Sequence, residues 1–210
     1  MTDLALNAAD WPGFPDTNLS VRELGLSRGE RRLISGLSLD LYSGDAVFLV
    51  GANGAGKTTL LRAIAGFVRP DSGSIGLSGE REDVIAWLGH SDGLKPNETL
   101  RQALRFWCGQ SGQPSKRIMP MLKALDIGHL IDRPAGRLSR GQQRRAGMAR
   151  VALANRPVWL LDEPAGPLDG DGRACLARLT EWHRARGGIV IAATHQVLDW
   201  PGAQTLEVGR

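Results

Sequence analysis

A glycine-rich loop between a short apolar segment and a helical pattern constrains this chain more than any other feature. Gly51-Ala-Asn-Gly-Ala-Gly-Lys57-Thr58 follows the apolar residues 45–50, and residues 58–67 then carry apolar side chains at helical spacing. Glycines let successive backbone N–H groups face one anion, and the N-terminus of the following helix adds its positive dipole end. Lys57 can contact β- and γ-phosphates, and Thr58 can bind Mg²⁺. The sequence therefore predicts a phosphate-binding loop.

Strand-like and helical segments alternate along the rest of the chain, which favours an α/β fold with a parallel sheet and right-handed crossovers. The expected strands are residues 19–24, 37–41, 45–50, 158–161 and 189–193. The expected helices are residues 58–67, 98–127 with an interruption at 109–114, 142–155 and 173–184. Residues 1–17 contain prolines and a glycine and show no period, so we expect a loose N-terminal extension.

Composition indicates one globular domain without a membrane span. The 210 residues include 42% hydrophobic and 23% charged side chains, which is ordinary for a globular protein. The longest apolar runs, near residues 46–50 and 188–193, are far shorter than the roughly 20 residues that a spanning helix needs. No secretory signal pattern opens the chain, and the net charge of +4 does not choose among nucleotide, nucleic acid and anionic lipid. Any membrane association is therefore expected to go through a partner.

Two carboxylates end the apolar segment Val158-Trp-Leu-Leu-Asp162-Glu163-Pro164. Asp162 at the strand end can hold Mg²⁺ beside a phosphate loop. Glu163 can polarise a water molecule for in-line attack on a γ-phosphate. A strand followed by an acidic helix cap would have the same sequence pattern, but the upstream phosphate loop favours a catalytic role for the two carboxylates.

The run Leu138-Ser139-Arg140-Gly141-Gln142 precedes a helix. Ser139 and Gln142 have the spacing of a capping box. A serine and exposed N–H groups at a helix N-terminus also form an anion site. The pattern alone allows either role.

The order of these motifs resembles that of the ABC-type ATPases, from about Leu19 to the C-terminus. The resemblance implies a P-loop core with a mainly parallel sheet, an N-terminal antiparallel β subdomain and a small inserted α-helical subdomain at about residues 91–150, within an ATPase domain of residues 18–210. It further implies a dimer that sandwiches two ATP molecules, with Mg²⁺, and gives His195 a contact with the γ-phosphate. The residues expected to bind ATP from the loop are Gly51, Ala52, Asn53, Gly54, Ala55, Gly56, Lys57, Thr58 and Thr59. Those expected to reach the ATP of the other subunit are Ser139, Arg140, Gly141, Gln142 and Asp169.

Three positions depart from the family pattern. Arg140 replaces the usual glycine of the Leu-Ser-x-Gly-Gln motif, and we expect the motif to function with its side chain turned away. His90 aligns with the usual Q-loop glutamine, where it can bind a metal-bound water or relay a proton, or be a bystander. Arg28 stands near the position of the missing adenine-stacking aromatic residue, and its guanidinium plane can stack on a base.

Short strings around these positions resemble the haem exporter ATPases of cytochrome c maturation. They are Leu88-Gly-His-Ser-Asp-Gly-Leu-Lys95, Gly141-Gln-Gln-Arg-Arg145 and Thr194-His-Gln196. The resemblance implies a peripheral subunit on the cytoplasmic face of a bacterial inner membrane, bound to integral membrane permease subunits and haem-handling proteins. Hydrolysis there supports haem delivery to apocytochromes, by releasing a haem-loaded chaperone. We expect no haem site on this chain.

Three other functions fit parts of the pattern. One is a short ABC subunit that exports lipid, drug or peptide. Another is a soluble ABC ATPase acting on nucleic acid, although the stretch between Lys57 and Ser139 leaves no room for a coiled-coil arm. The third is a non-hydrolysing switch, against which Glu163 argues.

We interpret the basic residues around the Leu-Ser-x-Gly-Gln motif as a solvated or ion-paired helix face without an aromatic platform for nucleic acid. They are Arg137, Arg140, Arg144, Arg145 and Arg150.

Overall fold

A five-stranded parallel sheet forms the centre of the molecule. The computed structural model describes residues 6, 10–196 and 198–209. The strand order is β5-β6-β7-β3-β8, and all neighbours run parallel. The strands are β3 (Ala46–Val50), β5 (Ile85–Leu88), β6 (Val158–Asp162), β7 (Ile189–Ala193) and β8 (Gln204–Glu207). Their carboxyl ends meet at one edge, where ligands bind in open α/β sheets.

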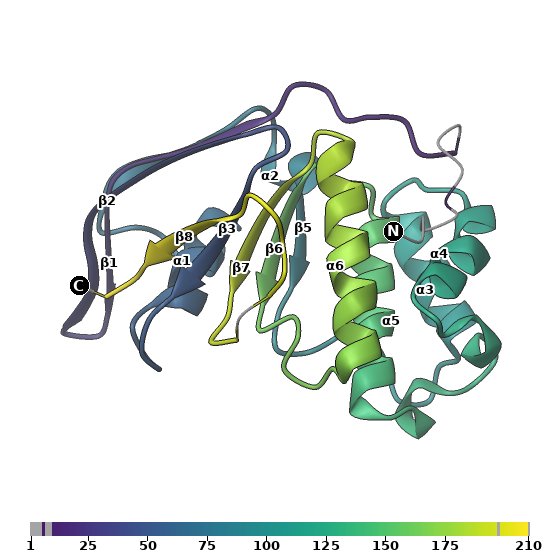
Figure 1. The fold of residues 1–210 in the computed structure, drawn as a ribbon. Coiled ribbons are helices and arrows are strands. Elements are labelled where there is room, and N and C mark those ends of the chain that lie inside the picture. Colours follow the sequence, from purple (N-terminus) through teal and green to yellow (C-terminus); the bar gives the residue numbers. More distant parts are fainter. Residues whose placement is uncertain (1–5, 7–9, 197, 210) are drawn as a thin grey trace.

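A second, antiparallel sheet lies beside the first (Figure 1). Its order is β2-β1-β4, and the strands are β1 (Asn18–Arg28), β2 (Arg31–Tyr42) and β4 (Ser72–Leu77). The expected antiparallel sheet is therefore present. Its strands β1 and β2 are much longer than the alternating segments in the sequence indicate.

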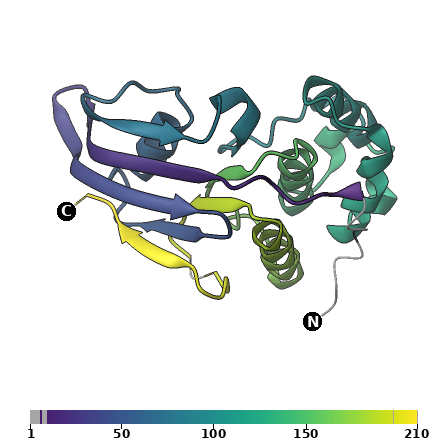
Figure 2. The same ribbon diagram turned by 90° about the horizontal axis from the view of Figure 1, so that it is seen from above.

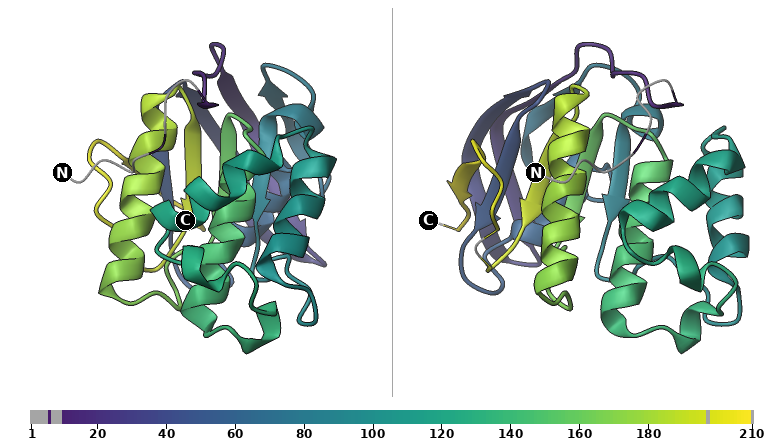
Figure 3. Two further views of the ribbon diagram at one scale, coloured as in Figure 1. Left: turned by 90° about the vertical axis from the view of Figure 1, so that its right-hand side faces the viewer. Right: turned by 45° about the vertical axis from the view of Figure 1, so that its right-hand side comes forward.

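Helices cover both faces of the parallel sheet and form a separate cluster at one end (Figures 1 and 3). The α-helices are α1 (Lys57–Ile64), α2 (Arg81–Val84), α3 (Leu100–Gln110), α4 (Ile118–Ala124), α5 (Arg140–Leu153) and α6 (Gly170–Ala185). Short 3-10 turns are η2 (Ser115–Arg117), η3 (Gly128–Leu130) and η4 (Ala135–Arg137). Helices α3 and α4 share a hydrophobic core with α5, in the range of about residues 91–150 where a helical subdomain is expected.

The parallel sheet separates two hydrophobic cores, because side chains alternate between its faces. On β6, Trp159 and Leu161 point into the core formed with α5 and α6. Val158 and Leu160 point instead toward α1 and the antiparallel sheet. Every residue of β6 and β7 is buried, as expected for strands covered on both faces. The sheet edge that carries the site is thus held from both sides.

The described part of the N-terminal extension is anchored at Trp11 and Thr17, whose side chains are buried, whereas residues 12, 13, 15 and 16 are exposed. Residues 10–17 run from β1 to the helical cluster (Figure 2). Trp11 is only 3% exposed and meets Trp182 edge-on, at 5.2 Å between ring centroids. Phe14 donates its backbone N–H to the Arg186 carbonyl at 2.7 Å. Aromatic burial holds this segment in place, and the other residues of the expected extension, apart from residue 6, lie outside the described residues.

Most expected elements are present with shifted ends. Helix α1 stops at Ile64 rather than at residue 67, because Gly66 adopts a left-handed φ of 83° just after it. Helix α6 begins at Gly170 rather than at residue 173, because the Asp169 carboxylate accepts a hydrogen bond from the Gly172 N–H at 2.8 Å. No pattern in the sequence predicts β4 or β8, whose side chains are largely exposed.

Candidate functional site

A cavity of about 590 Å³ opens at the carboxyl edge of the parallel sheet. The phosphate loop lines it, together with His90 after β5 and both carboxylates at the end of β6. Arg28 at the end of β1 lines it from the antiparallel sheet. The structure thus brings together the loop, Asp162, Glu163, His90 and Arg28, which the sequence predicts to share one site.

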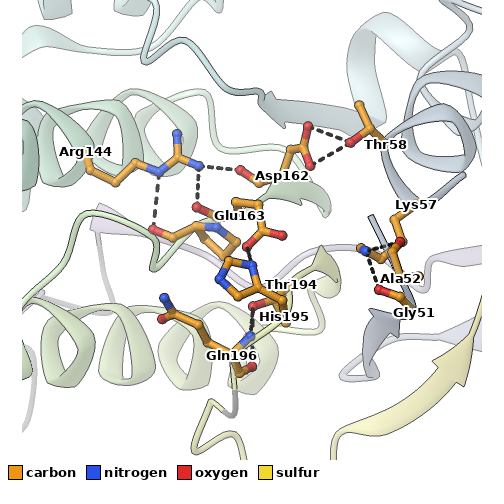
Figure 4. Close-up of polar contacts among 11 residues, drawn as sticks. Gly51, Ala52, Lys57, Thr58, Arg144, Asp162, Glu163, Thr194, His195 and Gln196 are labelled. Carbon is orange, nitrogen blue, oxygen red and sulfur yellow. Dashed lines mark hydrogen bonds and ion pairs between the residues drawn. The ribbon is translucent and has the colours of Figure 1, made fainter. Parts of the chain in front are cut away.

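The phosphate loop has the left-handed backbone that its glycines permit. Gly51, Gly54 and Gly56 have φ values of 143°, 78° and 109°. A Cβ on Gly51 would lie 2.5 Å from a neighbouring carbonyl oxygen, so only glycine fits there. The Lys57 ammonium, on a buried side chain, donates to the carbonyls of Gly51 at 2.6 Å and Ala52 at 3.1 Å (Figure 4). The cation is therefore held at the centre of the loop.

Thr58 and Asp162 form a direct hydrogen-bonded pair between α1 and β6 (Figure 4). The Thr58 hydroxyl donates to the two carboxylate oxygens at 3.0 and 3.1 Å. Burial raises the pKa of Asp162, and the neighbouring Glu163 raises it further, whereas the Thr58 hydrogen bond lowers it. A hydroxyl and a carboxylate held face to face are the oxygen ligands that suit Mg²⁺ in nucleotide sites.

Glu163 occupies a strained backbone position and pairs with His195. Its φ of 48° is left-handed, which is unfavourable for a residue with a side chain. Its N–H donates to the Ala193 carbonyl at 2.8 Å, across to β7. Its Oε2 atom lies 2.9 Å from His195 Nδ1, which forms an ion pair when the imidazole is protonated. The carboxylate and the imidazole therefore lie together at the sheet edge.

The Leu-Ser-x-Gly-Gln motif lies apart from this cavity. Ser139 caps α5 and forms the expected capping box with Gln142. Ser139 and Arg140 are exposed, and the described residues that line the cavity include none from 139–142. The motif is thus presented to the outside of its own chain.

Asp169 also lies outside the cavity and has a structural role within the chain. It caps α6 and pairs with Arg145 Nη2 at 3.1 Å. The hydrogen bond from the Gly172 N–H, and then the charge of Arg145, keep the pKa of Asp169 below its usual value. The carboxylate therefore stays ionised at the surface.

Arg144 is a site residue whose place the sequence does not reveal. Its sequence context predicts a solvated or ion-paired helix face; it is ion-paired, with Asp92 at 2.9 Å, but it is buried. Its guanidinium also donates to backbone carbonyls at the end of β6 (Figure 4). These carbonyl partners come from distant parts of the chain and leave no signal in the local sequence.

Comparison with known proteins identifies the family. A model of the ABC transporter family matches residues 34–166. The cytochrome c biogenesis ATP-binding export protein CcmA of Maricaulis maris is 58% identical over 206 residues, covering 95% of this chain and 96% of its own length. The chain belongs to the ABC transporter family, among its CcmA relatives. The CcmA of Paracoccus denitrificans is 46% identical, with 91% of this chain and 89% of its own length covered.

Solved structures of ABC proteins have the same fold. A putative ABC transporter ATP-binding protein from Pyrococcus furiosus has a TM-score of 0.80 at 23% identity, covering 91% of this chain and 97% of its own. The cbiO1 protein of Clostridium perfringens, part of an ABC transporter complex, has a TM-score of 0.71 at 28% identity, covering 85% and 78%. As a member of this family, the chain is an ATP-binding hydrolase of a transporter. Among the described residues, no helix is both long and apolar enough to cross a bilayer.

Proposed function

We propose that this chain is the ATP-hydrolysing subunit of a membrane complex that serves haem export or haem delivery in c-type cytochrome biogenesis. The observation that carries the proposal is the near full-length identity to CcmA proteins, which are named for cytochrome c biogenesis and export. The lining of the cavity by a phosphate loop and two carboxylates supports it. In this proposal hydrolysis drives release of a haem-loaded chaperone, and the chain itself binds neither haem nor nucleic acid.

The phosphate loop would hold ATP with groups that are already in place. Phosphate oxygens compete for the Lys57 ammonium with the Gly51 and Ala52 carbonyls, which carry only partial charge. Backbone N–H groups at the start of α1 face the same anion. Arg28 lines another wall of the cavity, where its planar guanidinium can cover the adenine.

Thr58 and Asp162 would hold Mg²⁺, which suits their paired oxygen atoms. The bound ion supplies charge neutralisation at the β- and γ-phosphates. Asp162 must be ionised to serve as a ligand, although burial raises its pKa. The charges of Arg144 and Arg62 oppose that rise in pKa and favour the ionised form.

Glu163 would orient and polarise the attacking water. Its carboxylate lines the cavity beside Asp162. The His195 imidazole, 2.9 Å away, holds the carboxylate in one direction, although His195 itself does not line the cavity. In this proposal its imidazole reaches the γ-phosphate when ATP is bound. His90 lines the same cavity and offers a further hydrogen-bonding group to the water.

A second copy of the chain would complete the site. Ser139 and Arg140 are exposed at the N-terminus of α5, away from their own chain's cavity. Exposed N–H groups and a serine at a helix start bind an anion well. Residues 139–142 and Asp169 therefore contact the ATP of the partner copy in this proposal.

The membrane partner would dock in an aromatic groove of about 660 Å³ between the end of α1, β5 and α3. Phe67 and Phe106 in this groove are 67% and 53% exposed, and clustered exposed apolar side chains mark interaction surfaces. Trp87 and Trp107 line the same groove. In this proposal a short amphipathic helix of an integral permease subunit covers the groove, which places the chain on the cytoplasmic face of a bacterial inner membrane.

Purification of the complex from membranes tests the proposal. We expect permease subunits and haem-handling proteins to co-purify with the tagged wild-type chain, and Phe106→Asp to lose them. Tyr42→Asp is the matched control, because Tyr42 is 61% exposed on β2, outside the groove. Membrane subunits without haem-handling proteins would favour export of lipid, drug or peptide instead. Equal recovery with Phe106→Asp would contradict the groove.

A further inference from the structure

Arg144 uses its whole hydrogen-bonding capacity at the junction of three chain segments. Its side chain is only 4% exposed, on the second turn of α5. Its Nε donates to the Pro164 carbonyl at 3.2 Å. Its Nη1 donates to the Gly89 carbonyl at 2.8 Å and to Asp92 Oδ1 at 2.9 Å. Its Nη2 donates to the Glu163 carbonyl at 2.9 Å and to the Asp162 carbonyl. A guanidinium has five N–H groups in a fixed fork, so each has a partner here. Lysine, with three donors on one atom, cannot make this pattern.

One end of the fork holds the backbone of Glu163. The left-handed φ of 48° at Glu163 is unfavourable and persists only where neighbouring groups fix it. The N–H of Glu163 is bound by the Ala193 carbonyl at 2.8 Å, and its C=O is bound by Arg144. Both backbone polar groups are thus anchored, which fixes the point from which the side chain projects, and His195 then holds the carboxylate. Figure 4 shows the guanidinium beside the carbonyls of Asp162 and Glu163, and the Glu163 carboxylate turned to His195.

The other end of the fork holds the segment that follows β5. Gly89, whose carbonyl accepts from the fork, directly precedes His90 in the cavity wall. The Asp92 carboxylate accepts from the same nitrogen. The Asp92 carbonyl accepts in turn from Arg150, which also binds the Trp87 carbonyl and lines the aromatic groove. Direct hydrogen bonds therefore connect the groove to the fork.

We propose that Arg144 is a positioning residue for ATP hydrolysis, which fixes the Glu163 backbone relative to the His90 segment. The inference rests on the proposed role of Glu163 as the group that polarises water. The five partners of the guanidinium lie at the end of β6 and in the segments that follow β5 and β6, not in the phosphate loop that holds Lys57. Arg144→Lys keeps a positive charge near Asp162 and leaves the phosphate loop intact, so loss of the fork should slow the hydrolytic step and leave the affinity for ADP unchanged.

The test compares Arg144→Lys with Arg184→Lys in the purified membrane complex. Arg184 is the matched control, because its side chain donates to the carbonyls of Gly44 and Pro201, outside the cavity. ADP titration calorimetry gives the number of intact sites and their Kd, and ATPase assays then give kcat for each intact site. We expect Arg144→Lys to lower that kcat by about 10- to 100-fold with an unchanged Kd for ADP. Arg184→Lys should retain the wild-type kcat for each intact site.

A purely structural role gives a different result. Arg144→Lys would then have fewer ADP sites or a lower Tm, but each remaining site would turn over as in the wild type, and the proposal would be overturned. If Arg144→Lys does not fold, Asp92→Ala tests the same junction, because it removes the carboxylate that anchors the Nη1 end of the fork beside the His90 segment. It should lower kcat for each site by about 5- to 10-fold, and a wild-type kcat would contradict the inference. Glu163→Gln in the same assays separates the two proposals, since continued turnover there overturns the role of Glu163 itself.

Discussion

The Thr58 hydroxyl lies 3.0 and 3.1 Å from the two carboxylate oxygens of Asp162 and joins the first helix to the sheet edge. A buried carboxylate without a cation is costly, and one neutral hydroxyl offsets only part of that cost. The raised pKa of Asp162 reflects this balance, with burial as its main cause. The buried Asp162 carboxylate is therefore suited to binding a cation, but it destabilises the folded chain when no cation is bound.

Asp162→Asn is expected to make the nucleotide-free protein more heat-stable at neutral pH. Because the folded-state pKa of Asp162 is raised, its contribution to stability is fully present below the unfolded pKa of about 4 and is lost as the pH rises through the folded pKa. Asparagine carries no charge at this position, so the variant does not lose stability as the pH rises. Thermal unfolding from pH 4 to pH 8 should show a Tm advantage for Asp162→Asn that grows with pH.

The same variant should lose the stabilisation that Mg²⁺ adds to bound ATP. The difference in Tm between ATP with Mg²⁺ and ATP with a chelator measures this contribution. Thr180→Ser is a suitable control, because the Thr180 hydroxyl donates to the Leu176 carbonyl within α6, outside the cavity. An equal response to Mg²⁺ in Asp162→Asn and the wild type would contradict the proposed ion site.

Glu163→Gln should bind ATP but stop turning it over. Glutamine keeps the size of the side chain and leaves Lys57 and the phosphate loop untouched, but it cannot accept a proton from the attacking water. We expect kcat to fall by about 100-fold or more, with little change in ATP affinity. ATP would then accumulate between two copies, so size-exclusion chromatography with ATP should detect a dimer. Steady hydrolysis at the wild-type rate would remove Glu163 from its proposed role.

Trp11→Ala should destabilise the whole chain without removing any group of the ATP cavity. The Trp11 ring lies near two guanidinium groups, with Arg117 4.3 Å and Arg186 5.5 Å from its centroid. Removal of this buried ring should cost about 3 kcal/mol and lower Tm by roughly 6 to 12 °C. Phe67→Ala is the control, because Phe67 is 67% exposed and its loss leaves no internal cavity. A Tm change below that of Phe67→Ala would show that the N-terminal segment contributes no packing energy.

Sequence patterns predict the parts of the site that are contiguous along the chain. The Gly51–Thr58 loop, the Asp162-Glu163 pair and the Ser139 cap each carry their chemistry within a few residues. Their positions relative to strands and helices follow from apolar periodicity, because buried parallel strands are short apolar runs. These local signals are enough to predict one cavity at the sheet edge.

Contacts between distant segments cannot be predicted in this way. The sequence around Arg144 is typical of a solvated helix face. Its side chain is buried instead, because it donates to backbone carbonyls of distant segments. Trp11 lies in a segment without periodicity, and its packing depends on Arg117 and Arg186, which are far away in sequence. The short strand β8 has mostly exposed side chains, so no hydrophobic pattern marks it. Tertiary partners decide each of these features.

His90 gives the last prediction, because we expect it to take the place of the Q-loop glutamine of ABC ATPases. It lines the ATP cavity and also a smaller cavity beside Arg140, so it faces both the hydrolytic centre and the start of α5. Imidazole and the glutamine amide can each donate and accept hydrogen bonds, whereas a methyl group can do neither. We therefore expect His90→Gln to keep most of the ATPase activity of the membrane complex and His90→Ala to lose about tenfold in kcat. His129→Ala, on η3 in the helical cluster, controls for loss of an imidazole elsewhere. If His90→Ala matches the wild type, His90 is a bystander and water is positioned by Glu163 and His195.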